Sequence, residues 1–560
     1  MEKFFKSFYK HYIFWIFAFT AVYTALYMIL FRLEAGTLFY MDTDPYTRAL
    51  RILDWLNNFQ WSEKIFPYGN PPDGFVLHFT RICDVIWVFL SLPFMLFMPL
   101  KEAIFYGGII FSPLFYALSL SSLFWALRLY LPALKNKETV FFIAVMMAML
   151  FFNKLSNCFD FCRPDHHSLM GFVFCFNLAV ILRNQLKSNP YENLLAGILA
   201  GCGVWASSAP EGFFVALLFL SVLSLNWIFG RENIKIPLYY SIGFFISVTL
   251  AWLINPPYGG WKVIDNNRLS LIHPALGAFM FLSFLITAKL QPQNKWQKLT
   301  VISACAALSF LLMLMVFGTA QIFSPTYSKE ANEYLIPYIA EMEPVFHDYV
   351  YLTWLIVGII LAVLWVFYTR LSQTYEKNLL FLEIATGLSL LFINRFHIYF
   401  LGIFTALYIL MLYICFSGTE KKLSYKYITL VYLLVPIFLL FSIRAVPQNT
   451  IFPEVQGIGL TKIFDAPRLV FEQNVDVIGF PYHTNPQGVA DNYLLCHLTK
   501  DDDVHEIFHR YNVQFIYISE ETASLGSDKE NNPGICEGLD LSKEYPWLKK
   551  TATGAYLIMN

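Results

Sequence analysis

Apolar segments long enough to cross a membrane recur along most of this chain. They lie at about 13–32, 104–129, 139–154, 168–184, 191–206, 209–229, 236–254, 269–288, 297–318, 349–369, 377–392, 396–416 and 426–444. A membrane-spanning helix needs roughly 20 apolar residues. Of the 560 residues, 57% are hydrophobic and 14% are charged, more apolar surface than a soluble core buries. The sequence therefore predicts a polytopic membrane protein.

The positions of the basic residues predict its orientation. With 13 spans and the N-terminus inside, the inner loops carry Lys135, Lys137, Arg183, Lys187, Arg231, Lys235, Lys289, Lys295, Lys298, Arg370, Lys377, Lys421, Lys422 and Lys426. This is the bias that the positive-inside rule requires. The apolar segment 85–98 is short and contains Pro93, so we expect an interfacial or re-entrant helix there. Counting it as a span would place the basic loops outside.

The longest polar segments then fall on the outer side. They are the loops 33–103 and 319–348 and the tail after about residue 445. The tail contains the strand-like run 515–518 after a helix-like segment, 503–511. We expect a polytopic all-α membrane domain over 1–445, with about 13 transmembrane helices, and a small C-terminal α/β domain over 446–560.

The predicted location is a bacterial inner membrane, with the N-terminus cytoplasmic and the C-terminal domain periplasmic. The first apolar segment lacks a small-residue cleavage site, so we expect it to stay in the protein as a helix. The net charge of −1 argues against a nucleic acid partner.

Three acidic segments meet the outer face in this topology. They contain Asp42 and Asp44, then Asp165, His166 and His167, and finally Glu341. Carboxylates at the membrane edge are costly to desolvate, so they face water, a cation or a partner charge. One alternative is that each segment is a hydrated loop end. Their convergence on one face favours a shared site for Mg²⁺ or Mn²⁺, with the imidazoles shifting the preference toward Mn²⁺.

Two further features bear on the chemistry. Adjacent histidines in a regular helix do not point at one ion, and no cysteine or distant histidine completes a set, so zinc is disfavoured. Arg395 lies at the outer end of a span, where it either pairs with a carboxylate or binds a phosphate group. No motif for a covalent nucleophile is present.

Several motifs together resemble a known family. They are Asp44-Pro45-Tyr46 after the first span, the acidic segment around Asp165, Ala340-Glu341 with Pro344 before a late span, Arg395-Phe396, Tyr68-Gly69-Asn70-Pro71-Pro72, and the run 511–516. This pattern resembles the catalytic subunit of oligosaccharyltransferase and its single-subunit counterparts, which are polyprenyl-dependent C-type membrane glycosyltransferases. The resemblance covers nearly the whole chain and also implies 13 spans with an extracytoplasmic C-terminal domain.

The resemblance implies an inverting transfer of a sugar or oligosaccharide from a polyprenyl phosphate or diphosphate, assisted by Mg²⁺ or Mn²⁺. It implies catalytic roles for Asp44, Asp165 and Glu341, and a metal site formed by Asp44, Asp165, His167 and Glu341. His167 stands where the family commonly has Glu. Arg395 would bind the lipid diphosphate, and we expect His166 and Tyr46 to contact substrate.

One family signature is absent. The Trp-Trp-Asp element, which reads the Ser or Thr of a glycosylated Asn-x-Ser/Thr sequence, does not occur in the tail, where 455–460 and 481–485 take its place. The acceptor therefore stays open between a membrane lipid, a polysaccharide and a protein. The alternative function is a non-catalytic transporter or binding protein for lipid-linked glycans, which should place its charges at the membrane midplane.

Overall fold

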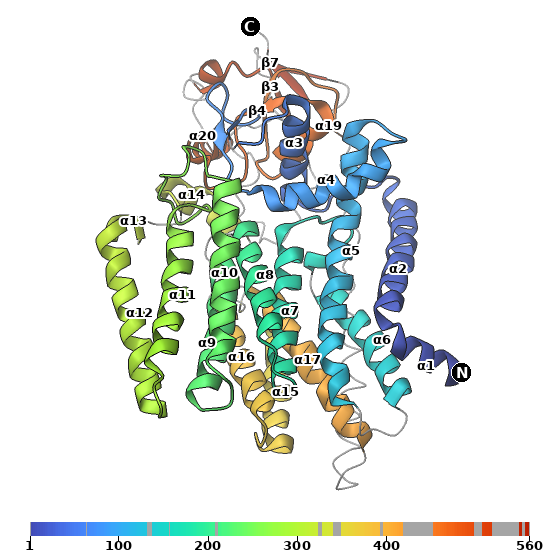
Figure 1. The fold of residues 1–560 in the computed structure, drawn as a ribbon. Coiled ribbons are helices and arrows are strands. Elements are labelled where there is room, and N and C mark those ends of the chain that lie inside the picture. Colours follow the sequence, from blue (N-terminus) through green and yellow to red (C-terminus); the bar gives the residue numbers. More distant parts are fainter. Residues whose placement is uncertain are drawn as a thin grey trace.

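Long helices packed side by side form the body of the molecule in the computed structural model (Figure 1). The structure describes residues 2–558 except 63, 132–136, 156, 208–210, 323–326, 340–345, 347–348, 392–395, 418–451, 498–506, 518–547 and 552–554. The long helices of the body are α2 (Tyr12–Ala35), α5 (Leu100–Leu127), α6 (Lys137–Leu155), α7 (His166–Asn184), α8 (Pro190–Ala206), α9 (Glu211–Ile228), α10 (Lys235–Ile254), α11 (Ile272–Leu290), α12 (Lys295–Phe317), α15 (Tyr349–Thr369), α16 (Thr374–Leu390) and α17 (His397–Ser417).

These helices coincide with the apolar segments of the sequence. A helix lies at every predicted span from 13–32 to 396–416, and the last, 426–444, lies outside the described residues. Among the described helices, 7 are long and apolar enough to cross a membrane. The predicted class, a polytopic helical membrane protein, is therefore confirmed.

Glycine lets two of these helices pack closely. A Cβ on Gly197 of α8 would lie 2.0 Å from the backbone oxygen of Tyr240, and one on Gly243 of α10 would lie 2.1 Å from that of Leu194. Small residues bring membrane helices close enough for their backbones to touch, which replaces the hydrophobic force that lipid does not provide. Larger side chains at these two positions would separate α8 from α10.

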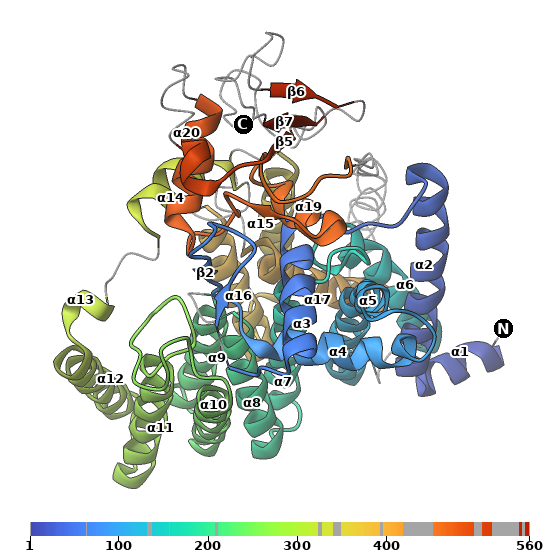
Figure 2. The ribbon, with the colours of Figure 1, turned by 90° about the horizontal axis from the view of Figure 1, so that it is seen from above.

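Shorter helices connect and cover the ends of the bundle. They are α1 (Glu2–Lys10), α3 (Thr43–Asn58), α4 (Arg81–Met95), α13 (Thr319–Ile322), α14 (Lys329–Tyr334), α19 (Ala466–Gln473) and α20 (Pro486–His497), with 3₁₀ turns at Arg128–Tyr130, Asn157–Phe159 and Ile336–Tyr338. Helix α4 lies across the bundle in both views (Figures 1 and 2). Its exposed side chains include Val85, Phe89 and Leu92, which recur at helical spacing. This placement agrees with the interfacial helix expected at 85–98.

A small sheet lies at one end of the bundle, beside α19 and α20 (Figure 1). It contains β3 (Ile458–Thr461), β4 (Asp476–Val477), β5 (Phe515–Tyr517), β6 (Leu548–Lys550) and β7 (Tyr556–Ile558) in the order β4-β3-β5-β7-β6. Strand β3 is parallel to β4 and β5, while β7 is antiparallel to β5 and β6. The predicted strand at 515–518 is therefore present, and the C-terminal α/β structure expected from the sequence is confirmed.

The loop after α2 attaches this sheet to the membrane helices. It contains the hairpin strands β1 (Ile65–Phe66) and β2 (Phe75–Val76). Beside the hairpin, the Val477 amide donates to the Tyr68 carbonyl at 3.1 Å, and the Asn70 amide donates to the Ile478 carbonyl at 2.9 Å. The first loop thus extends the edge of the C-terminal sheet at β4.

Candidate metal centre

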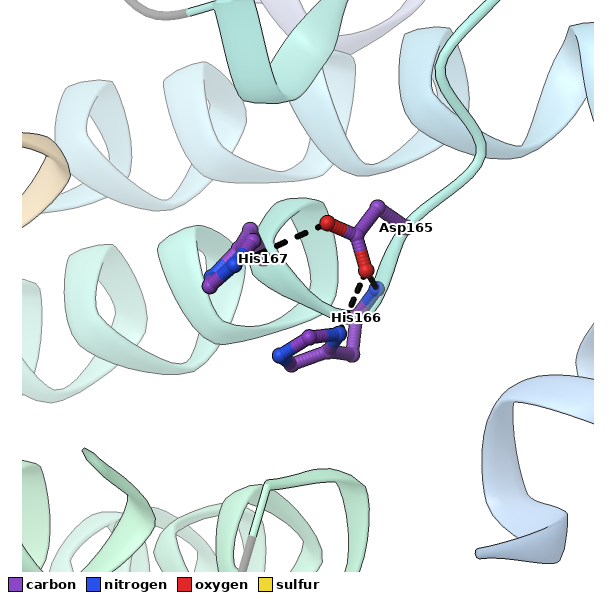
Figure 3. Close-up of side chains that lie close together, drawn as sticks. All are labelled: Asp165, His166 and His167. Carbon is purple, nitrogen blue, oxygen red and sulfur yellow. Dashed lines mark hydrogen bonds and ion pairs between the residues drawn. The ribbon is translucent and has the colours of Figure 1, made fainter. Parts of the chain in front are cut away.

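Asp165 contacts both histidines that follow it. It is the N-cap of α7, and its Oδ1 accepts a hydrogen bond from the His166 backbone amide at 2.5 Å. The same oxygen contacts Nδ1 of His166, while Oδ2 lies 3.6 Å from Nε2 of His167 (Figure 3). All three residues are buried, and one ligand atom from each lies within 4.8 Å of the others. The cluster offers oxygen and nitrogen donors to one divalent ion.

This arrangement corrects the expectation that two adjacent histidines cannot serve one site. Asp165 has an extended backbone, with φ −137° and ψ 157°, and stands just outside the helix. Its carboxylate therefore lies against the first turn, where each of its oxygens faces one imidazole. The cluster includes His166 with His167, although the sequence assigned only His167 to the metal.

The charge state of Asp165 suits a metal ligand. Burial by itself raises the pKa of this carboxyl, but the neighbouring charges of His166 and His167 and the hydrogen bond from His166 lower it more. The pKa of Asp165 is consequently held well below its usual value, so the side chain is an anion at neutral pH.

Glu211 is a member of this cluster that sequence reasoning missed. It begins α9, is 1% exposed, and has Oε1 3.3 Å from Nδ1 of His167. The Tyr399 hydroxyl donates to Oε1 at 2.5 Å, and the Ser207 hydroxyl donates to Oε2 at 2.9 Å. A carboxylate that contacts the far nitrogen of a ligand histidine fixes its tautomer and ring orientation. The available signal was an acid at the start of the apolar run 209–229.

Asp44 lies close enough to Asp165 for their charges to interact. It sits in the first turn of α3 and is partly exposed. Desolvation, then the charges of Asp165 and Asp42, raise the pKa of Asp44 to about 7, against the Tyr482 hydrogen bond and the Arg48 charge, which lower it. Like charges this close repel, and a cation between them relieves the repulsion. The donor set therefore fits a divalent ion held by Asp44, Asp165 and an imidazole.

Asp42 has a supporting position beside this pair. Its side chain caps α3 by accepting from the Thr43 amide at 2.7 Å. Its Oδ2 also lies 2.8 Å from both Nε and Nη2 of Arg163. The Met41 amide donates to the Cys162 carbonyl at 3.0 Å. These contacts fasten the segment before α3 to the segment before α7, and so bring two of the predicted acidic segments together.

A buried ionic cluster anchors the helix that carries Asp44. Asp84 of α4 is fully buried and lies 3.2 Å from Nη1 of Arg48, 3.4 Å from Nε of Arg51 and 3.3 Å from Nη1 of Arg81. Each of these guanidinium groups is also almost fully buried. Arg48 stands one turn after Asp44 on α3, and its charge interacts with both Asp44 and Asp165. The cluster therefore joins α3 to α4 and places a cation beside the two acids.

The remaining predicted site residues have different placements. Tyr46 is 2% exposed; its hydroxyl accepts from the Tyr40 amide at 3.0 Å and its ring packs against Phe471. Glu341 and Arg395 lie outside the described residues. The structure thus brings together Asp44, Asp165, His166 and His167 and adds Glu211.

Comparison with known proteins identifies the fold. No family model and no curated protein matches the chain. It does match solved structures of the Archaeoglobus fulgidus oligosaccharyltransferase. The apo form is 15% identical, with a TM-score of 0.64 over 90% of this chain and 69% of that one. The complex of that archaeal oligosaccharyltransferase with an inhibitory peptide and a dolichol-phosphate is 15% identical, with a TM-score of 0.62 over 91% of this chain and 70% of that one. The complex with Zn and sulfate is 14% identical, with a TM-score of 0.63 over 97% and 73%. The chain has the oligosaccharyltransferase fold in a divergent form.

Proposed function

We propose that this membrane protein is a metal-assisted, inverting glycosyltransferase. It moves a sugar or an oligosaccharide from a polyprenyl phosphate or diphosphate to an acceptor outside the cytoplasm. The observation that carries the proposal is the buried group of Asp165, His166 and His167 beside Asp44, at the end of the helical bundle that bears the C-terminal sheet. The oligosaccharyltransferase fold supports it, because its solved examples include complexes with a dolichol-phosphate and with an acceptor peptide.

In this proposal the metal ligands are Asp44, Asp165, His167 and Glu341, with His166 an additional donor. A bound Mg²⁺ or Mn²⁺ supplies Lewis-acid stabilisation of the charge that develops on the leaving phosphate. Arg395 binds the phosphate groups through its guanidinium fork. The contacts of His166 and Tyr46 with substrate stay predictions.

The residues divide the reaction between acceptor and donor. Asp44 orients the acceptor nucleophile and takes its proton. A bond forms between the acceptor atom and the anomeric carbon while the bond from that carbon to the phosphate oxygen breaks. A single displacement of this kind inverts the anomeric centre. Glu211 keeps His167 in position throughout, since it contacts the ring from the opposite side.

The proposal includes an arrangement in the membrane. Residues 1–445 form the transmembrane part, and 446–560 form a periplasmic domain over its outer face, in a bacterial inner membrane. The described acidic cluster lies at the end that bears the C-terminal sheet, where an enzyme needs it to meet an extracytoplasmic acceptor. The acceptor is a lipid, a polysaccharide or a protein.

A deletion strain tests the proposed function. Lipid-linked sugars and envelope glycans are profiled in the deletion strain and after complementation with the wild type, Asp44→Ala, Asp165→Ala or Glu341→Ala. We expect the donor to accumulate and one glycan to disappear in the deletion strain, with restoration by the wild type alone. Full restoration by all three variants, expressed at wild-type levels, would refute the metal-assisted reaction.

A further inference from the structure

The C-terminal region contacts the acidic site directly through one side chain. The Tyr482 hydroxyl donates a hydrogen bond to Oδ1 of Asp44 at 2.8 Å, although the two residues are 438 positions apart. Tyr482 lies between β4 and α20, whereas Asp44 lies in the first turn of α3. No motif in the sequence links these two residues.

The ring of Tyr482 is held on several sides. It is 4% exposed and stacks on Phe75 at 6.2 Å with an interplanar angle of 24°. Phe79 meets it edge-on at 5.4 Å and 79°, and His78 lies 5.7 Å away. These neighbours all come from the loop after α2. A buried aromatic ring has few torsions to vary, so its hydroxyl is delivered to a defined place.

The hydroxyl is a permanent donor at this position. Burial, followed by the charge of Asp44, raises the pKa of Tyr482 well above its usual value. The phenol therefore keeps its proton, and an ionised carboxylate only accepts hydrogen bonds. The Thr47 side chain, on the same helix as Asp44, is also hydrogen-bonded to this phenol. Tyr482 consequently grips the first turn of α3 at two points.

Asp44 needs such a restraint because the charges around it conflict. Asp165 and Asp42 repel its carboxylate, while Arg48 attracts it. A charge-assisted hydrogen bond is roughly twice as strong as a neutral one and has a preferred direction. The bond from Tyr482 fixes the orientation of the Oδ1 atom, and with it the direction in which the carboxylate presents its lone pairs.

We infer that Tyr482 is a positioning residue that orients Asp44 for the metal, and that the C-terminal region thereby completes the site. The inference rests on the proposed function, since it assumes that Asp44 is a ligand. Two backbone hydrogen bonds dock this region on the first loop, between Val477 and Tyr68 and between Asn70 and Ile478. Docking and metal binding are coupled through the phenol.

Binding of Mn²⁺ to the full-length protein tests this inference. The protein is purified in detergent, stripped with a chelator and titrated with Mn²⁺, which is followed by electron paramagnetic resonance. Loss of a hydrogen-bond partner to a metal ligand costs about 10-fold to 100-fold in metal affinity. We expect a Kd about 10-fold higher for Tyr482→Phe, and no saturable binding at this site for Asp44→Ala.

Tyr511→Phe is the matched control. Its hydroxyl also joins the C-terminal region to the first loop, through Asn70 at 3.1 Å, and it donates to Asp491 at 2.5 Å. The control removes a buried phenol bond between the same two segments without touching Asp44. We expect its Kd for Mn²⁺ to match that of the wild type, even where its melting temperature falls as far as that of Tyr482→Phe.

The outcomes separate this inference from the proposed function. Wild-type protein without saturable Mn²⁺ binding would overturn both. Binding that Asp44→Ala abolishes but Tyr482→Phe leaves intact would overturn the inference alone. Equal weakening by Tyr482→Phe and Tyr511→Phe would also overturn it, because the phenol would then act only through general stability.

Discussion

Single carboxylates do distinct work in this protein because their neighbours differ. Asp165 faces two imidazoles and is strongly ionised, whereas Asp44 faces two acids and has a pKa raised to about 7. Glu211 is almost fully buried and is hydrogen-bonded to Tyr399 and Ser207. The first two suit direct contact with a cation, and Glu211 suits support of His167.

Glu211→Gln tests that supporting role. The substitution keeps the side-chain volume but removes the anion beside His167, so the ring loses the partner that makes it a better ligand. We expect the affinity for Mn²⁺ to fall about 10-fold to 100-fold, measured by isothermal titration calorimetry. Ser207→Ala is the control, because it removes one donor to Glu211 and leaves the carboxylate. An unchanged affinity in Glu211→Gln would remove Glu211 from the site.

At the scale of elements, the junction between α3 and α4 determines where Asp44 stands. One carboxylate, Asp84, faces three guanidinium groups in a nearly waterless environment. A buried charge without its partner is far more costly than an exposed one. Asp84 is therefore expected to stabilise the junction much more than a surface ion pair does.

Asp84→Asn measures that contribution. It leaves Arg48, Arg51 and Arg81 without their shared anion, and we expect a loss of about 3–5 kcal/mol in the free energy of unfolding. The control is Asp54→Asn, which breaks a more exposed pair with Lys64 at 2.7 Å and should cost about 0–1 kcal/mol. Chemical denaturation in detergent compares the two variants. Similar small losses would contradict the role assigned to Asp84.

The loop between α9 and α10 has a pH-sensitive carboxyl. Burial raises the pKa of Glu232 from 4.5 to about 7, although hydrogen bonds from Asn226 and Gln185 lower it. Above its unfolded value, the unfolded chain loses this proton before the folded protein does. The contribution of Glu232 to stability therefore falls as the pH rises from 4.5 to about 7, and the full loss is present above that range.

Glu232→Gln should remove this dependence. We expect the variant to gain melting temperature relative to the wild type between about pH 5 and about pH 8, with the larger advantage at the higher pH. Thermal unfolding at both values provides the measurement. An advantage that is constant with pH would show that the Glu232 carboxyl titrates normally in the folded state.

At the scale of the whole molecule, the membrane helices and the C-terminal sheet place the acidic cluster at one end of the bundle (Figure 1). The orientation follows from the basic loops, since chains keep Lys and Arg on the cytoplasmic side. The short connection between α11 and α12 lies at the opposite end from the sheet (Figure 1). The two ends should therefore react differently with a reagent that does not cross the membrane.

Asp73→Cys and Gln293→Cys test the orientation. Both positions are exposed, the first in the loop after α2 and the second between α11 and α12. A membrane-impermeant maleimide added to spheroplasts should label Asp73→Cys alone, and should label Gln293→Cys only after lysis. The wild type measures the background from its own cysteines. The reverse pattern would place the acidic cluster on the cytoplasmic side.

The sequence by itself predicted the helices and the acidic segments, because both depend on local properties. A long apolar run forms a helix in lipid whatever its neighbours are, since its backbone has no other hydrogen-bond partners. The acids at the ends of these runs are visible for the same reason. The segments with Asp44 and Asp165 were therefore identified as neighbours before any fold was known.

Only the tertiary structure decided how the side chains meet. The contact of His166 with Asp165 depends on a carboxylate that stands just outside its helix, and the contact of Glu211 with His167 depends on the packing of α9 against α7. The bond between Tyr482 and Asp44 crosses 438 positions. Residue type and spacing carry no information on such contacts, because the energy that selects them comes from packing and charge among segments that are distant in the chain.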